Sequence, residues 1–455
     1  MSPVSELLKR IEENSSNAAI VYEDDTYLYA DLLALKKTVD LSLIENGVHP
    51  GDVVALLGDY SPLSMAILLS LLENRNIVVP ISIGMDTGGE QYLSISDPDF
   101  LIETDYPDFS ITSRQRESQK NDLLSQMASD NLPGLILFTS GTTGTPKAVL
   151  HDMQKLMSKF LEADKRYTTL CFLMFDHIGG VDTYFYSLFS GGLAVFPNSR
   201  DPAYICQLVE RHEIEVLPVS PTFLNLVLLS GAHKQSDMSS LKIITFGSEK
   251  ISDHLLQRVG SEFDSVRLLQ KYGITELGSP SSKTHADNPS LIKMHGEQIE
   301  ARVVDGILQL RTPSAMVGYL NADSPFTADG WFVTGDAAEV HGGYIKILGR
   351  KSDLMNVGGE KVYPAEVESV ILEMDSVAEV TVFGEANPIL GEMVCAKVRP
   401  VEEVDETEEE QFTITLKDYC AGKMEKHKVP VKLYITNEKL HSDRFKKVTG
   451  SGNAG

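Results

Sequence analysis

The sequence contains little cysteine, and the few cysteines form no recognisable site. Four occur among 455 residues, namely Cys171, Cys206, Cys395 and Cys420. No two of them have the C-x-x-C spacing, and no group of histidines accompanies them. A zinc site or a redox-active cysteine pair is therefore not indicated. We expect buried, reduced thiols of the kind found in cytosolic proteins.

Long apolar runs and basic character are also missing. The N-terminal residues lack the apolar core of a signal peptide, and the most apolar stretch, 64–72, is far too short to span a bilayer. Asp and Glu number 65 against 40 Lys and Arg, which gives a formal net charge of -25. We therefore expect a cytoplasmic protein without membrane insertion and without nucleic-acid binding. A local site can still bind a small anionic nucleotide.

What is present is an alternation of short apolar runs and helix-like segments, in a chain long enough for two or more domains. Strand-like runs lie at 53–57, 77–81, 193–196, 216–219 and 243–246, and helix-like segments at 64–73, 203–211, 222–229 and 252–259. This alternation predicts buried, mostly parallel sheets with helical crossovers.

The pattern changes after about Ala301. The runs 302–304 and 307–310 flank Asp305-Gly306, which predicts a tight β-hairpin, and Gly342-Gly343 predicts a further turn. We therefore expect a β-rich subdomain within a large α/β domain that covers residues 1–349.

Past Gly349 the sequence is typical of a small α+β unit. A helix is predicted at 364–374, with Pro364 in its first turn, and strands at 377–383 and 393–398. The acidic run 402–410 is expected to be a solvated loop. This second domain is predicted to cover residues 350–455.

One loop is chemically suited to hold a polyphosphate. The apolar run 135–138 leads into Thr139-Ser140-Gly141-Thr142-Thr143-Gly144-Thr145-Pro146-Lys147. Glycines let backbone N–H groups approach phosphate oxygens, hydroxyls add donors, and Lys147 adds a positive charge. It is not a Walker P-loop, because Pro146 stands where that motif requires the glycine before its lysine. An apolar strand leading into this composition is unusual for a plain surface loop.

The run Ser-Gly-Thr-Thr-Gly-x-Pro-Lys resembles the signature of the acyl-adenylate-forming superfamily, which includes acyl- and aryl-CoA synthetases, non-ribosomal adenylation domains and firefly luciferase. The signature is highly specific, although Ala148 replaces its usual next glycine. The resemblance extends over nearly the whole chain from about Ala19. It implies that the small domain is mobile and that ATP and Mg²⁺ are the cofactors. It also implies nucleotide contacts from Thr139, Ser140, Gly141, Thr142, Thr143, Gly144 and Lys147.

Two further segments match this family in the expected order. Tyr272-Gly273-Ile274-Thr275-Glu276 resembles its aromatic-Gly-x-Thr-Glu motif, and Gly247-Ser248-Glu249 resembles its adenine-side loop. The resemblance implies that Tyr272 stacks on adenine, that Thr275 bonds the α-phosphate as a catalytic residue, and that catalytic Glu276 holds Mg²⁺. It also implies that Gly247 and Gly273 line both the nucleotide and the acid. Outside that context, a tyrosine after a strand is usually part of the core.

Asp336 and Arg350 complete the nucleotide contacts that the resemblance implies. Thr334-Gly335-Asp336 resembles the ribose-binding motif, in which the Asp336 carboxylate accepts from both ribose hydroxyls. Gly349-Arg350 begins the hinge motif, and Arg350 would contact ribose or phosphate. A Gly-Asp pair by itself more often marks a turn.

The small domain carries the remaining matches. Ser352 corresponds to the hinge pivot, and Gly358, Gly359 and Lys361 correspond to the loop that lines the thiol tunnel. Alignment of the segment from Leu440 places Lys447 on the family's catalytic lysine, with Lys446 as the alternative. A simple turn before the helix at Pro364 is the other interpretation of the two glycines.

The resemblance implies two steps at one site: a carboxylic acid and ATP form acyl-AMP and pyrophosphate, and a thiol of CoA or of an acyl carrier protein then displaces AMP. The position where amino-acid activators keep an aspartate is occupied by Ile178, which cannot balance a buried ammonium. We therefore favour an aryl or fatty acyl acid. His177 resembles the aromatic or His gate beside the acyl site of the synthetases.

Two other functions remain open. Asp176 keeps an amino-acid-activating enzyme that loads a carrier protein as one alternative. A non-catalytic ATP- or AMP-binding relative is the second alternative. His177 could equally be a structural histidine.

Overall fold

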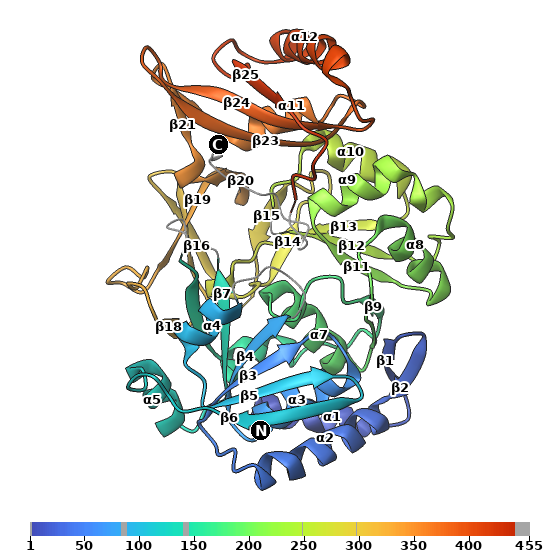
Figure 1. Ribbon diagram of the computed structural model, residues 1–455, viewed down its shortest axis with the longest axis vertical. Helices are drawn as coiled ribbons and strands as arrows, with labels where there is room; N and C mark the ends of the chain where they lie inside the picture. The colour runs from blue at the N-terminus through green and yellow to red at the C-terminus, as the bar shows by residue number, and fades with distance from the viewer. Residues whose placement is uncertain (1, 83–88, 140–144, 248, 297, 442–455) are drawn as a thin grey trace.

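The computed structural model describes residues 2–82, 89–139, 145–247, 249–296 and 298–441. The described chain forms four sheets with helices around them. Figure 1 shows the C-terminal sheet and its two helices lying at one end of a much larger α/β body. The predicted fold class, a large α/β part with mostly parallel sheets and a β-rich subdomain plus a small α+β part, is confirmed. We propose the division at 349/350, just before the last residue of β20 (Tyr344–Arg350), and call the two parts the large and the small domain.

One sheet of the large domain is parallel except at its edge. In spatial order it contains β13 (Arg267–Gln270), β12 (Ile243–Phe246), β11 (Val216–Val219), β9 (Thr168–Leu170), β10 (Leu193–Val195), β1 (Ala18–Tyr22) and β2 (Asp25–Leu28). The helices of this half of the domain are α8 (Pro202–Arg211), α9 (Pro221–Ser230) and α10 (Asp253–Glu262), while α7 (Ile178–Ser190) buries its apolar side chains in the core of the other half. All four residues of β11 are buried, as expected for a strand covered on both faces.

The second sheet has a parallel centre and antiparallel edges. It contains β18 (Gly318–Tyr319), β8 (Lys147–Asp152), β7 (Gly134–Thr139), β4 (Ile77–Ser82), β3 (Val53–Gly58), β5 (Phe100–Asp105) and β6 (Asp108–Ser113). The helices of this half are α1 (Pro3–Glu13), α2 (Tyr29–Glu45), α3 (Pro62–Glu73), α4 (Gly89–Ser96), α5 (Asp122–Ser129) and α6 (Met153–Met157). Ser61 caps α3 by accepting from the Ser64 backbone, and Pro62 occupies the first turn, so the helix starts where its apolar run starts.

The third sheet is the β-rich subdomain, and it is antiparallel. It contains β14 (Ser282–Thr284), β15 (Leu291–Met294), β20, β19 (Phe332–His341), β17 (Ile307–Arg311) and β16 (Glu300–Val304). The predicted hairpin is confirmed: Asp305 and Gly306 both have positive φ, 51° and 74°, as a two-residue I′ turn requires. The Gly342-Gly343 turn between β19 and β20 also has positive φ at both residues.

The small domain contains a mixed sheet and two helices. Its strands are β22 (Glu360–Val362), β21 (Met355–Val357), β24 (Gly391–Pro400), β23 (Val377–Asn387) and β25 (Lys432–Ile435), and its helices are α11 (Pro364–Ile371) and α12 (Glu406–Lys423). The predicted helix 364–374 is three residues too long, because Met374 N–H donates back to Ile371 and closes a tighter final turn. Short 3₁₀ turns complete the assignment: η1 (Ser158–Phe160), η2 (Ala232–Lys234), η3 (Thr275–Leu277) and η4 (Lys351–Asp353).

The prediction of a loop at 402–410 is wrong in its second half, because α12 begins at Glu406. The Asp405 side chain accepts from the backbone of Thr407 and Glu408, and the Glu408 side chain accepts from the Asp405 backbone. This capping box satisfies otherwise unpaired N–H groups, and negative charge is favourable at a helix N-terminus. The acidic run is therefore a start signal for the helix.

The structure also bears on the cysteines and on the expectation that the chain does not span a membrane. All four cysteines are free and buried. None of the helices that the structure describes combines the length and the apolar character needed to cross a membrane.

Candidate active site

The predicted phosphate loop connects two paired strands. Thr139 at the end of β7 lies opposite Lys147 at the start of β8, so the sheet holds both ends of the loop. Lys147 therefore projects from a fixed strand position at the mouth of the loop. The residues expected to cradle phosphate between them, Ser140, Gly141, Thr142, Thr143 and Gly144, lie outside the described residues.

Lys147 is linked to the predicted metal ligand Glu276 through Tyr319. The Lys147 ammonium lies 5.1 Å from the centre of the Tyr319 ring, and the Tyr319 hydroxyl donates to Glu276 Oε1 at 2.6 Å. Tyr319 lies on β18, which pairs with β8 two residues beyond Lys147. The structure therefore brings two sequence-predicted residues together through one that the sequence analysis missed. No motif marks Tyr319; only the pairing of β18 with β8 reveals it.

Thr275 is positioned by a buried histidine that was also missed. His151 on β8 donates from Nε2 to the Thr275 carbonyl at 2.7 Å. Burial, the largest influence, lowers the pKa of His151 to about 4. The ring is therefore neutral near pH 7, and because a carbonyl only accepts, its Nε2 carries the proton. His151 orients the Thr275–Glu276 turn and does not act there as a charged group.

Tyr272, Asp336 and Arg350 form a second cluster. The Tyr272 hydroxyl donates to Asp336 Oδ2 at 2.6 Å, and Arg350 Nε lies 3.1 Å from Asp336 Oδ1. Asp336 and Arg350 are opposite residues on β19 and β20, which fixes this geometry. Burial raises the pKa of Asp336, although Arg350 and Tyr272 act in the opposite direction. Each Asp336 oxygen has one partner and retains acceptor capacity, so the carboxylate fits a pair of hydroxyl donors.

The glycines of the two nucleotide motifs are required by close packing. A Cβ on Gly247 would lie 2.5 Å from the Lys271 carbonyl oxygen, and one on Gly273 would lie 2.7 Å from Ser279 Oγ. Glu249 accepts from the Thr222 backbone and hydroxyl, at 3.2 and 2.7 Å, so its carboxylate ties this loop to the start of α9. Ser248 lies outside the described residues.

On the acid side, the structure gives His177 and Asp176 structural partners. His177 caps α7 by accepting from Gly179 N at Nδ1, at 3.1 Å. Asp176 is buried and accepts from the Ser82 backbone at 3.2 Å. Ile178, which begins α7, is 2% exposed. The Ser82 contact gives Asp176 Oδ2 a structural partner.

An ion pair that the sequence analysis missed braces the same region. Lys159 in η1 bonds both carboxylate oxygens of Asp182 on α7, at 2.7 and 2.6 Å. Its ammonium also donates to the Ser279 carbonyl at 3.0 Å. Lys159 therefore connects α7 with the segment that follows Glu276. Its sequence surroundings carry no signal, since its partners Asp182 and Ser279 lie 23 and 120 residues away.

Apart from Arg350, the small-domain residues named from the sequence belong to neither of these clusters. Ser352 lies in η4, exposed, with its hydroxyl bonded to Asp353. Gly358 and Gly359 form the positive-φ turn between β21 and β22 and are exposed, as is Lys361. Lys446 and Lys447 lie outside the described residues.

The carboxylates near the loop do not form a metal centre by themselves. Among residues 2–82, 89–139, 145–247, 249–296 and 298–441, no three or more His, Cys, Asp or Glu side chains are grouped so as to hold an ion. Glu276 supplies a single carboxylate, which fits Mg²⁺ held mainly by substrate phosphates and water.

Comparison with known proteins gives the family. The model of the AMP-binding enzyme family matches residues 7–332, and the model of the AMP-binding enzyme C-terminal domain matches residues 366–447. Among solved structures, an anthranilate CoA ligase in complex with anthranoyl-AMP has a TM-score of 0.85 at 20% identity, covering 98% of this chain and 95% of that one. The ATP-bound structure of MatB from Rhodopseudomonas palustris has a TM-score of 0.79 at 23% identity, covering 97% of this chain and 96% of that one.

Sequence relatives are acid–CoA ligases. The 3-[(3aS,4S,7aS)-7a-methyl-1,5-dioxo-octahydro-1H-inden-4-yl]propanoyl:CoA ligase of Mycobacterium tuberculosis is 35% identical over 60% of this chain, a match that spans 57% of that ligase. Indoleacetate–CoA ligase of Aromatoleum aromaticum is 27% identical, covering 84% of this chain and 85% of that protein. A 2-succinylbenzoate–CoA ligase of Listeria monocytogenes is 26% identical and covers 95% of both. This chain belongs to the AMP-binding enzyme family.

Proposed function

We propose that this chain is an AMP-forming ligase that joins a ring-bearing carboxylic acid to CoA through an acyl-AMP intermediate. The observation that carries the proposal is a pair of electrostatically linked clusters, one of Lys147, Tyr319 and Glu276 at the start of β8, the other of Tyr272, Asp336 and Arg350. The first group supplies charge suited to phosphates and a metal ion, and the second supplies acceptors suited to a ribose.

In the first step a carboxylate oxygen of the acid attacks the α-phosphorus of ATP. The bond to the bridging oxygen breaks, and pyrophosphate leaves with the electron pair. Lys147 and the loop would hold the leaving phosphates, and Thr275 would donate to the α-phosphate. Mg²⁺ held by Glu276 would neutralise phosphate charge. Asp336 would hold the ribose, beside Tyr272. Positioning and charge neutralisation supply the catalysis in this step.

In the second step the CoA sulfur attacks the acyl carbonyl carbon. A C–S bond forms, the C–O bond to AMP breaks, and the thiol proton is released. The Gly358–Gly359 turn and Lys361 are exposed in the present arrangement, so lining a thiol path would require the small domain to rotate. Ser352 in η4, just past β20, is the proposed pivot, since a few residues at an element end can absorb such a change.

Two observations support a ring-bearing acid over an amino acid or a linear fatty acid. Ile178, at the position where amino-acid activators keep an aspartate, offers no charge to balance an α-ammonium, and the nearby Asp176 is engaged through Oδ2 by the Ser82 backbone. The relatives named above act, by their names, on indoleacetate, 2-succinylbenzoate and an indene-derived propanoate, each with a ring system. They are CoA ligases, which supports CoA as the acceptor over a carrier protein.

A substrate panel tests this proposal. Purified protein with MgATP should release pyrophosphate with at least one aryl or alicyclic acid, and much less with α-amino acids and long-chain fatty acids. With the active acid, CoA should yield a thioester detectable by mass, and a phosphopantetheinylated carrier protein should not substitute at equal concentration. Greatest activity with an amino acid would overturn the acid assignment, and exclusive loading of the carrier would overturn the acceptor.

A further inference from the structure

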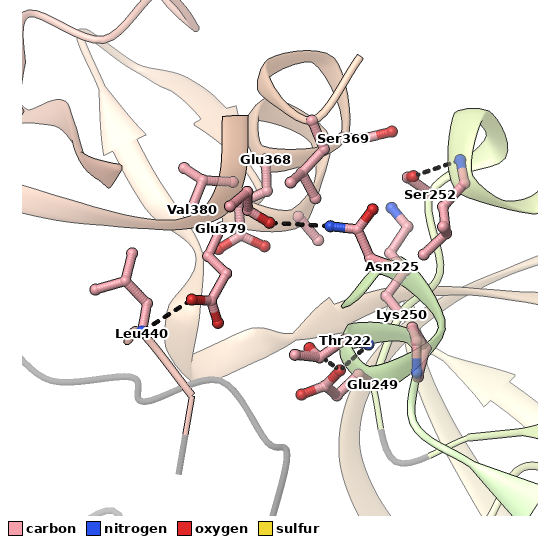
Figure 2. Close-up of a pocket in the computed structure, with 15 residues that line it drawn as sticks. Thr222, Asn225, Glu249, Lys250, Ser252, Glu368, Ser369, Glu379, Val380 and Leu440 are labelled. Carbon is pink, nitrogen blue, oxygen red and sulfur yellow. Dashed lines mark hydrogen bonds between the residues drawn. The ribbon is translucent and has the colours of Figure 1, made fainter. Parts of the chain in front are cut away.

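A small pocket lies where the two domains meet. Figure 2 shows it bounded by α9 and the segment around Lys250 from the large domain, and by α11, β23 and Leu440 from the small domain. Its volume is about 40 Å³, which suits a few water molecules and is too small for an acid or a nucleotide. The pocket is therefore of interest for the residues of the two domains that line it, and not as a binding site for a substrate.

A buried hydrogen bond crosses this boundary. Asn225 of α9 is 8% exposed and donates from Nδ2 to the Ala378 carbonyl of β23 at 2.9 Å. The bond joins segments 153 residues apart and exists only while α9 and β23 are in contact. Charge acts across the same boundary: burial lowers the pKa of Lys250, while the carboxylates of Glu366 and Glu368 on α11 act in the opposite direction. Asn225 therefore stabilises this relative placement of the domains.

The Ala378 carbonyl is available to Asn225 because of a β-bulge. In the pairing of β23 with β24, Val377 lies opposite Pro400 and Glu379 lies opposite Arg399, which leaves Ala378 as the additional residue. A bulge residue has no ladder partner and turns its neighbours locally. The carbonyl of Ala378 is thus directed to the large domain, while the next side chain, that of Glu379, is directed to the C-terminal segment.

Glu379 anchors the point at which the chain enters that segment. It is 6% exposed and accepts hydrogen bonds from His441 Nδ1, from Arg399 Nε and, at 3.3 Å, from the Leu440 backbone. Burial acts to raise its pKa, but the bonds from His441 and Arg399 hold it below the usual value. Glu379 is therefore an ionised, buried anchor. The two candidate catalytic lysines, Lys446 and Lys447, follow His441 by a few residues.

We propose that the Ala378–Glu379 bulge couples contact between the domains to the placement of the lysine-bearing segment, which makes Asn225 and Glu379 positioning residues for the adenylation step. This inference rests on the proposed function. The Asn225 bond must break if the small domain rotates for the thiol step, whereas the bonds of Glu379 lie within the small domain and rotate with it. Asn225 thus acts on adenylation through the domain arrangement, and Glu379 through Leu440 and His441, from which the segment continues. The inference takes the present arrangement, in which Gly358, Gly359 and Lys361 are exposed, as the one used for adenylation.

Half-reaction kinetics test the inference. Asn225→Ala should slow acid-dependent pyrophosphate release about 3- to 10-fold, the range expected when one buried hydrogen bond is lost. It should leave AMP release from supplied acyl-AMP and CoA unchanged or faster, because that step needs the bond broken. Glu379→Gln should slow the first step and spare the second. The ratio of the two rates is the readout that a merely structural role would not move.

A matched control separates stability from positioning. Asn76→Ala removes another buried asparagine, whose Nδ2 donates to the His49 carbonyl at 2.8 Å inside the large domain. It should change both rates in the same proportion. Asn225→Asp keeps the shape and removes the donor, so it provides a second variant if the alanine protein does not fold.

The outcomes are distinct. Equal effects of Asn225→Ala or Asn225→Asp on both steps, or no effect on either, would overturn the coupling while leaving the ligase proposal intact. Absence of pyrophosphate release from the wild-type protein with every acid would instead overturn the proposed function.

Discussion

Lys447→Ala is expected to reduce acid-dependent pyrophosphate release by about 100- to 1000-fold, the loss typical of removing one charge-stabilising donor from a transition state. The lysine would bridge the substrate carboxylate and the α-phosphate as negative charge gathers between them. In acyl-AMP the substrate carboxylate has become a neutral acyl group, so the lysine no longer has two negative groups to bridge. Conversion of supplied acyl-AMP and CoA to thioester and AMP should therefore stay within a few-fold of wild type. Stopped-flow assays of the two half-reactions provide the measurement.

Lys446→Ala is the matched control for this experiment, since it removes the same charge one position away. It should adenylate at a rate close to that of wild type. If Lys446→Ala is inactive and Lys447→Ala is active, the alignment from Leu440 is wrong by one residue. If both variants adenylate normally, the small domain does not supply the catalytic lysine.

Glu276→Gln is expected to reduce adenylation by at least about 100-fold, because a neutral amide is a poor ligand for a hard cation and the loss of metal stabilisation is worth several kcal/mol. The shape is retained, and the amide oxygen can still accept from the Tyr319 hydroxyl, which bonds Glu276 at 2.6 Å in the native chain. The defect should therefore lessen as Mg²⁺ is raised. Rates measured across a Mg²⁺ titration give the result.

Tyr319→Phe separates the charge of Glu276 from its orientation. It removes the hydroxyl bond but leaves the carboxylate and most of the ring face beside Lys147. We expect a loss of about 10-fold or less, in line with one hydrogen bond to a charged group. Normal turnover of Glu276→Gln at limiting Mg²⁺ would remove Glu276 from the metal site.

The sequence predicted the elements whose signals are local. Runs of buried β-branched and aliphatic residues identified the parallel strands, and Asp305-Gly306 identified a hairpin because both residues adopt positive φ. Local reasoning failed at the acidic run. There Asp405 and Glu408 form a capping box, so charges that suggest a solvated loop in fact begin α12.

In the candidate site, too, some residues could be predicted from the sequence and others could not. Motifs identified Lys147, Glu276, Tyr272, Asp336 and Arg350, and the structure brings them into two clusters beside the loop. The residues that orient them, Tyr319 and His151, could not be found from the sequence. Their partners lie 43 and 124 residues away, and each contact depends on strand pairing that no local pattern specifies.

The interface between the domains was the least accessible to sequence reasoning. Asn225 is an ordinary polar residue in an apolar helix, and Ala378 is one residue of an apolar strand. The bulge at Ala378 depends on the register between β23 and β24, and the bond to Asn225 depends on domain placement. Neither can be derived from residue types alone.

A single-turnover experiment tests the central claim most directly. Protein in excess is mixed with labelled MgATP and the active acid without CoA, and the products are separated before and after CoA is added. We expect one pyrophosphate for each acyl-AMP formed on the protein, followed by release of AMP and appearance of the CoA thioester only after CoA is added. Formation of ADP and phosphate, or of thioester without prior acyl-AMP, would contradict this claim.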